Sequence, residues 1–188
     1  MRSYVRLFGI TLAGGFACGG SNVAPEDFVL PPGAPPAVRT DAGVYVLARV
    51  DGGYEAEALA TYTNTTSRIV YYQRCTREYP GPIYGLRRTG PDSTARTFLG
   101  TVWACVGGVP TGRVLPDATL SARVSLGSTD SPSAQPPITP GERVGRFRIE
   151  FSLCAQYADD SDDCVALPQA ARESNAFELH FGTHAPAP

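Results

Sequence analysis

Hydrophobic and polar residues alternate with a period of two along much of this chain, most clearly in Val144–Leu153. The apolar members of that segment are Phe147, Ile149, Phe151 and Leu153. Successive side chains of a strand point to opposite faces, so the pattern predicts a strand with one buried face. Other runs rich in branched and aromatic residues, only some of them alternating, predict further strands at Val44–Val50, Tyr54–Thr63, Ile69–Cys75, Ile83–Arg88, Arg96–Cys105, Thr119–Leu126 and Phe177–Phe181.

Turn-forming residues separate these runs, at Asp51-Gly52-Gly53, Asn64–Ser67, Pro80-Gly81-Pro82 and Gly127–Pro140. A helical pattern is confined to a single turn at Gln169–Arg172. Eight or nine short strands without a long amphipathic helix predict an all-β fold. The expected architecture is an antiparallel β-sandwich, immunoglobulin-like in the broad sense.

The N-terminus has the layout of a bacterial secretory signal. Arg2 and Arg6 precede the apolar run Leu7–Ala17, and Cys18 follows directly. A small residue followed by cysteine resembles a lipoprotein signal, which implies cleavage before Cys18 and attachment of lipid to it. The predicted location is then the cell envelope, anchored in membrane lipid. An ordinary secretory signal cut near Ala17, which would release a soluble domain, and a cytoplasmic protein remain the alternatives.

Proline content marks the boundary of the folded part. Residues 1–17 are predicted to be the signal peptide, and residues 18–40 a tether rich in proline and glycine. The β-sandwich is expected over residues 41–184, and residues 185–188 form a tail.

Charge is nearly balanced, with 18 acidic and 16 basic residues, and every basic residue is arginine. No segment concentrates positive charge. The composition therefore argues against nucleic acid as a partner and against electrostatic docking on anionic lipid.

Four cysteines remain when the predicted lipid-anchor residue is set aside: Cys75, Cys105, Cys154 and Cys164. An even number in an exported chain indicates two disulfides, with three possible pairings. We predict Cys75–Cys105 and Cys154–Cys164, because the second pair brackets a short polar segment and each cysteine of the first pair ends a strand-like run. Zinc is the alternative, but the C-x-x-C pairs typical of zinc sites are missing from the sequence.

A cluster of carboxylates lies between the last two cysteines, at Asp159, Asp160, Asp162 and Asp163. Oxygen ligands at this density could bind calcium, although the EF-hand order of acids is not present. The alternative is a solvated hairpin tip. We therefore expect no cofactor, with calcium at this loop as the alternative.

Tyrosines gather in one part of the sequence, at Tyr71, Tyr72, Tyr79 and Tyr84, with several arginines among them. Aromatic and arginine side chains together can form a flat surface that binds sugar or protein. The alternative is that one of Tyr71 and Tyr72 belongs to the core and the others line the turn.

Catalytic chemistry has little support in the sequence. Glu178, His180 and His184 could converge on a metal or on a proton transfer, but alternation predicts an ordinary surface pair on the last strand. The sequence has no G-x-S-x-G motif and no phosphate-binding glycine loop. We therefore expect a protein that is not an enzyme.

Two segments resemble a known family. Residues 60–65 followed by Ile69–Cys75, and Thr139-Pro140-Gly141-Glu142 followed by Phe147-Arg148-Ile149, are similar to BsuPI-type proteinase-inhibitor domains. The resemblance implies an immunoglobulin-like fold. It also raises a second possible function, a proteinase inhibitor that inserts Tyr79–Tyr84 or Ser128–Gln135 into a protease.

Together these features predict a non-enzymatic, lipid-anchored envelope protein. Its β-sandwich would present an interaction surface to another envelope protein or to polysaccharide. A proteinase inhibitor and a calcium-dependent binding module are the alternatives.

Overall fold

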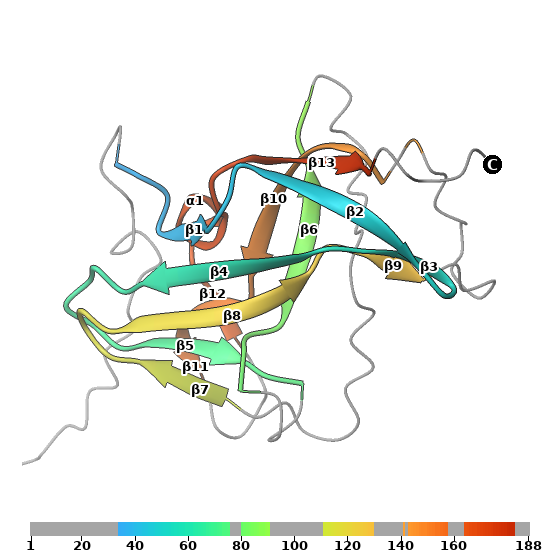
Figure 1. Ribbon diagram of the computed structural model, residues 1–188. Helices are drawn as coiled ribbons and strands as arrows, with labels where there is room; N and C mark the ends of the chain where they lie inside the picture. Colours follow the sequence, from blue (N-terminus) through green and yellow to red (C-terminus); the bar gives the residue numbers. More distant parts are fainter. Residues whose placement is uncertain are drawn as a thin grey trace, which may run out of the picture.

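The computed structural model describes residues 34–75, 80–90, 111–129, 141, 143–157 and 164–182 (Figure 1). Within these ranges the chain forms thirteen strands and one helical turn. The predicted all-β class is confirmed at this level. The expected eight or nine strands are too few, because five short strands are not predicted and one predicted run is divided in two. The predicted strand Arg96–Cys105 lies outside the described residues.

The strands form three sheets. The first has the order β1 (Val38–Thr40), β4 (Glu57–Thr63), β8 (Thr119–Ser125). The second has the order β6 (Tyr84–Arg88), β10 (Gly145–Phe151), β13 (Phe177–Phe181), β2 (Val44–Val50), β3 (Gly53–Glu55), β9 (Ser128–Thr129). The third has the order β12 (Cys164–Ala166), β11 (Leu153–Tyr157), β5 (Val70–Gln73), β7 (Thr111–Val114). In Figure 1, β4 and β8 cross the middle, β5 and β7 lie below them, and β2 and β13 lie above.

Single bends carry the chain from one sheet to the next. Ala56 separates β3 from β4, and the Leu126 amide across from it donates a hydrogen bond to the Ala56 carbonyl at 2.9 Å. Ser152 separates β10 from β11 in the same way. At Gly127, a Cβ would lie 2.1 Å from the Tyr54 carbonyl oxygen, so only glycine permits this close crossing. The bends curve the sheets around one core.

These bends divide two of the predicted strands. Tyr54–Thr63 becomes β3 and β4, and Val144–Leu153 yields β10, which ends at Phe151. The sequence pattern does not predict β1, β7, β9, β11 or β12, since most of these strands are too short to show a period. β1 lies within residues 18–40, the predicted tether, and pairs with β4, so the folded domain begins before residue 41.

The pairing of β2 with β13 is parallel, with Val44 opposite Glu178 and Leu47 opposite Phe181. The other strand pairs among the described residues are antiparallel. The expectation of a purely antiparallel fold is therefore wrong at this pair. It joins two segments far apart in the sequence, and no local turn signal specifies such a contact.

The predicted alternation is confirmed on the inner faces. The buried side chains of β10 are Phe147, Ile149 and Phe151, and the pattern extends to Leu153 at the start of β11; all four are fully buried. Those of β4, β8 and β13 include Ala58, Ala60, Tyr62, Ala122, Val124, Phe177 and Leu179. They form one hydrophobic cluster between the sheets.

Asn64 closes the corner between the first and third sheets and is fully buried. Its Nδ2 donates hydrogen bonds to the carbonyls of Arg68 at 2.7 Å and Val114 at 2.9 Å. Its Oδ1 accepts from the amide of Thr66 at 3.1 Å and from the Thr66 hydroxyl at 2.7 Å. The predicted turn after β4 is thus held by one amide side chain that also reaches β7.

The helical turn α1 (Gln169–Arg172) follows β12, as predicted, and anchors against β10. Arg172 pairs with Glu150 of β10 at 2.5 Å, and Arg87 of β6 pairs with Glu173. The buried Ser174 accepts a hydrogen bond from the Ile149 amide at 2.9 Å through its hydroxyl. These contacts cover one end of the outer face of β10.

The predicted Cys154–Cys164 disulfide is present and joins β11 to β12, with the two Cα atoms 5.4 Å apart. Cys75 is also disulfide-bonded. Cys105 lies outside the described residues, so its pairing with Cys75 stays a prediction.

Two inward-facing tyrosines have raised pKa values. The Tyr45 hydroxyl donates a hydrogen bond to the Asp41 carboxylate at 2.5 Å, and this bond lowers the pKa of Asp41. Burial, followed by the same hydrogen bond, raises the pKa of Tyr45 to about 12. Burial alone raises the pKa of Tyr62 to about 12.

We expect the chain to lose stability as the pH rises from 10 to 12. In the folded state Tyr45 and Tyr62 keep their protons up to a pKa of about 12, whereas the ordinary value is 10.0. The unfolded state therefore ionises first, and the stabilisation, complete below pH 10, is lost as the pH passes through 12. Urea unfolding at about pH 8 and about pH 11.5 measures the loss. Tyr62→Phe should lose less stability over this interval, and an equal loss in this variant would contradict the assignment.

Candidate functional site

The four tyrosines of the predicted binding patch do not share one surface. Tyr71 points outward from β5 and is half-buried, whereas Tyr72 points inward and packs against the core. Tyr84 is buried, and its hydroxyl accepts a hydrogen bond from the Ser125 amide at 2.9 Å. Tyr79 lies outside the described residues. The patch is therefore wrong for Tyr72 and Tyr84, which serve the core.

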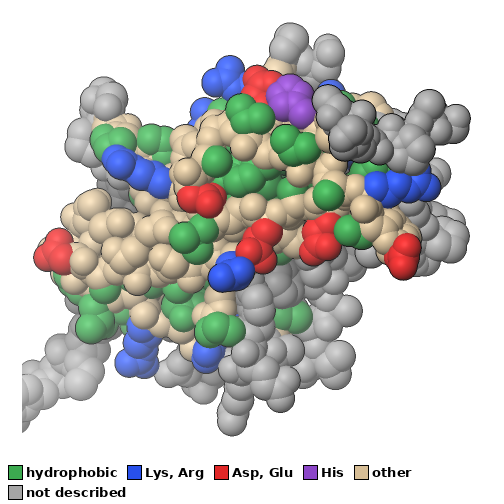
Figure 2. All heavy atoms as spheres, viewed as in Figure 1, with side chains coloured by type: hydrophobic (Ala, Val, Ile, Leu, Met, Phe, Trp, Pro, Cys, Tyr) green, Lys and Arg blue, Asp and Glu red, His purple; other side chains and the backbone are tan. Residues whose placement is uncertain are grey.

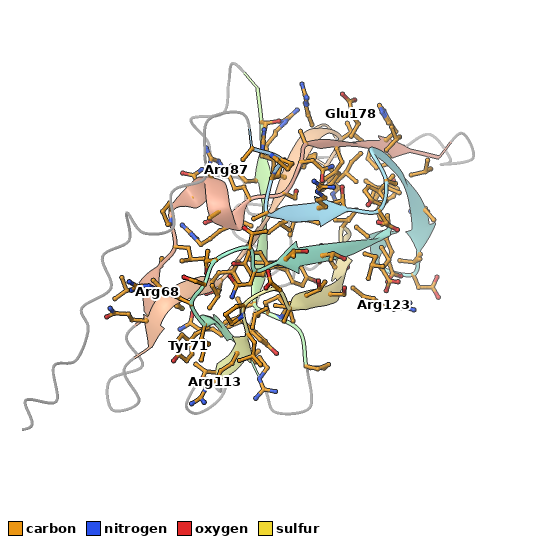
Figure 3. All side chains as sticks on the ribbon, turned by 90° about the vertical axis from the view of Figure 1, so that its left-hand side faces the viewer. Arg68, Tyr71, Arg87, Arg113, Arg123 and Glu178 are labelled. Atoms are coloured by element: carbon orange, nitrogen blue, oxygen red, sulfur yellow. A yellow bond between two sulfur atoms is a disulfide. The ribbon has the colours of Figure 1, made fainter. Side chains whose placement is uncertain are left out.

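Tyr71 nevertheless belongs to a mixed polar and aromatic surface on the third sheet. The guanidinium of Arg113, its register partner on β7, lies 5.8 Å from the centre of the Tyr71 ring. Figure 3 shows these two side chains together at one end of the molecule, near Arg68. Beside them, the Ser152 hydroxyl donates to Gln73 Oε1 at 2.7 Å. This surface offers one aromatic face and one cation.

The remaining candidates are placed less completely. Asp159, Asp160, Asp162 and Asp163 lie outside the described residues, as do Cys18 and His184. Within the described part of the chain, no three His, Cys, Asp or Glu side chains converge as a metal site would require. His180 and Glu178 form the predicted surface pair, with 3.4 Å between Nε2 and Oε2, and both are about half exposed.

The outer face of β2 is apolar along its whole length. Its outward residues are Val44, Val46, Ala48 and Val50, which we call the β2 stripe. The valines are 56%, 57% and 42% exposed, and the alanine is exposed too. Between them, Tyr45 and Leu47 point into the core. Both faces of this strand are thus hydrophobic, and Figure 2 shows the exposed hydrophobic side chains near acidic ones.

The β13 side of the stripe carries one acid, one histidine and one glycine. Glu178 lies opposite Val44, and His180 lies opposite Val46. The next outward position is Gly182, where a Cβ would stand 3.4 Å from a Val46 methyl carbon. The absent side chain leaves Val46 open to solvent.

The β3 side of the stripe carries a second acid. Glu55 is exposed and lies opposite Ala48. Further out on the β13 side, the exposed Arg146 of β10 lies opposite Glu178. The strands directly beside the stripe therefore present two carboxylates, and the nearest outward arginine is one strand further away.

Arg49 is the one charged residue of β2, and it stands on the inward side of the strand. Its guanidinium lies 6.0 Å from the centre of the Tyr54 ring, and that of Arg143 lies 5.4 Å from the same ring. Tyr54 in turn contacts Phe181, with 4.7 Å between ring centres. Arg49 is exposed, but its position on the inward side of β2 directs its charge away from the outer face of the stripe.

Three other large hydrophobic side chains are exposed in the described residues: Leu59, Leu115 and Val165. They belong to β4, the β7–β8 turn and β12, so they stand singly on separate elements. Single exposed hydrophobic residues are ordinary, whereas contiguous ones mark interaction surfaces. The β2 stripe is therefore the strongest candidate site.

The sequence holds a signal for this site that the strand prediction alone does not use. Six of the seven residues of Val44–Val50 are apolar, so the segment does not alternate. A continuous apolar run is typical of a strand that is covered on both faces. In this structure the described residues cover only one.

Comparison of the chain with protein-family models, with curated proteins and with solved structures found no match. The similarity to BsuPI-type domains therefore stays a prediction. None of the helical structure in the described residues is long and apolar enough to cross a membrane.

Proposed function

We propose that this chain is a non-enzymatic envelope protein, anchored by lipid at Cys18, that binds another envelope protein through the β2 stripe. One observation carries the proposal: the outward residues of a central strand are all apolar and exposed. About half of each valine stands in water. Burying that half would contribute about 1 kcal/mol per valine to binding.

The stripe contributes little to folding, because its side chains point outward and do not pack in the core. Exposed substitutions usually change the free energy of unfolding by less than about 0.5 kcal/mol. A polar version of the stripe should therefore fold normally. This separates loss of binding from loss of structure.

The double variant Val44→Thr/Val46→Thr tests the proposal. Threonine keeps the branched shape and the strand propensity but replaces a methyl group by a hydroxyl on each side chain. We expect the wild-type chain in solubilised envelopes to migrate on native gels in a complex larger than the single chain. The variant should bind its partner at least about tenfold more weakly and migrate as the free chain.

A matched control is available in Leu59→Thr/Leu115→Thr, which removes two exposed hydrophobic side chains elsewhere. This control should keep the complex, and all three proteins should show the same urea midpoint. Migration of the wild type as a free chain, or equal loss of the complex in both double variants, would overturn the proposal.

A glycan ligand is the second candidate, favoured by the Tyr71–Arg113 pair on the third sheet. An aromatic ring flanked by a guanidinium can stack against a sugar and bind its hydroxyl groups. Binding of this kind would be lost in Tyr71→Ala and retained in Val44→Thr/Val46→Thr.

We also propose that the architecture is immunoglobulin-like in the broad sense. Support comes from sheets that pack their inner faces over one core and from the antiparallel pairing of most described strands. Cys18 would hold this domain at a membrane surface, which leaves the stripe available to other envelope proteins.

A further inference from the structure

We infer that the occupant of the β2 stripe is an extended protein segment that alternates apolar with basic side chains. This inference rests on the proposed function and specifies the chemistry of the partner at the same site. It is carried by the charge that surrounds the stripe. Apolar side chains of the partner would cover the valines, and its lysines or arginines would reach the carboxylates on either side.

The geometry favours an extended segment. The stripe is one strand wide, and its residues recur at every second position of β2. Side chains of a strand laid on it would meet the stripe with the same period of two. Glu178 stands beside one end, at Val44, and Glu55 stands beside Ala48 on the opposite side. Both carboxylates are exposed and can be reached by a long basic side chain.

A second copy of this chain fits less well. Stacking one β2 stripe on another brings four glutamates to the same interface, two from each copy. Arg146 lies opposite Glu178 and offsets part of that charge within each copy, but Glu55 lies opposite Ala48 and has no arginine across from it, because Arg49 packs inward on Tyr54. Like charges placed together at an interface oppose association.

A lipid surface and a sugar also fit less well. Carboxylates on both sides of the stripe would be repelled by anionic headgroups. Sugars stack on aromatic rings, and the stripe consists of valine and alanine alone. A basic, apolar polypeptide is the class that both the hydrophobic stripe and its acidic flanks accept.

The test uses the full chain and three capped peptides of equal length and valine content. One alternates valine with lysine, one alternates valine with glutamate and one alternates valine with serine. Binding is followed by the NMR shifts of the Val44 and Val46 methyl groups, with Ala122 in the core as reference. We expect the lysine peptide to bind most tightly and the glutamate peptide least, with a difference of about tenfold or more.

Charge-neutral variants separate the two parts of the inference. The double variant Glu55→Gln/Glu178→Gln should lower the affinity for the lysine peptide about fivefold and leave the affinity for the serine peptide unchanged. Asp117→Asn, which removes an exposed carboxylate at the β7–β8 turn, should change neither. Raising the salt concentration should lower the affinity for the lysine peptide but not the affinity for the other two peptides.

Equal affinity for the three peptides, preference for the glutamate peptide or absence of binding would each overturn the basic-partner inference. Three other results would also overturn it. They are a concentration-dependent dimer of the wild-type chain, a shift of the Val44 and Val46 methyl signals on anionic vesicles, and occupation of the stripe by another segment of this chain. A native complex that is lost in Val44→Thr/Val46→Thr but kept in Glu55→Gln/Glu178→Gln would contradict this inference and still support the proposed function. A native complex that persists unchanged in Val44→Thr/Val46→Thr would instead contradict the proposed function.

Discussion

Replacing Asn64 by alanine should lower the free energy of unfolding by about 3 kcal/mol, and aspartate should lower it further. Alanine leaves the carbonyls of Arg68 and Val114 without the donor that now lies 2.7 and 2.9 Å away. It also removes the acceptor of the Thr66 amide. Aspartate is worse because it turns a carboxylate oxygen toward those two carbonyls in a fully buried site.

Urea unfolding of the full chain measures this effect. Thr61→Ala is the matched control, because its hydroxyl hydrogen-bonds the exposed Ser121 hydroxyl, at 3.2 Å, in the same sheet. The control should stay within about 0.5 kcal/mol of wild type. If Asn64→Ala behaves like the control, Asn64 does not hold the corner between the two sheets.

Replacing Phe147 by alanine should cost about 3–5 kcal/mol of stability. The side chain is fully buried at the centre of β10, between Arg88 of β6 and Phe177 of β13 in the register. Its removal leaves a cavity that neighbouring β strands cannot close without breaking their hydrogen bonds. Phe147→Leu should lie between wild type and alanine.

The neighbouring Arg146 provides the control, since it points outward from the same strand and is exposed. Arg146→Ala should change the free energy of unfolding by less than about 0.5 kcal/mol. Similar losses at positions 146 and 147 would show that the assigned inward and outward faces of β10 are incorrect.

The contrast between these neighbours explains what the sequence predicts well. In a strand with one buried face, every second residue is apolar, as at Phe147, Ile149 and Phe151. The helical turn at Gln169–Arg172 and the Cys154–Cys164 bridge were equally local signals, and both are present. Local chemistry was enough for these elements.

Other features depend on contacts that sequence periodicity does not contain. The parallel pairing of β2 with β13 joins the two ends of the domain, and β1 becomes a strand only because β4 lies beside it. A cluster of tyrosines in the sequence likewise does not show which of their side chains point outward and which point into the core. Tyr71 faces out and Tyr84 is buried because each follows the alternation of its own strand.

The candidate site shows a different limit. The run at Val44–Val50 predicts a strand with two apolar faces, but the sequence does not say what covers the second face. Only the arrangement of β13, β2 and β3 shows that the described residues leave it open between two carboxylates. The site is therefore a property of the sheet order as much as of the strand.

The most direct measurement is photocrosslinking in intact cells with a photoreactive amino acid placed at Val46. The same residue placed at Ser121, on the exposed outer face of the first sheet, is the control. We expect a defined crosslink to another envelope protein from position 46 and none from position 121, with the attachment point in a segment that alternates apolar and basic residues. No protein crosslink at position 46, or equal crosslinking from both positions, would contradict the claim that the β2 stripe is a binding surface.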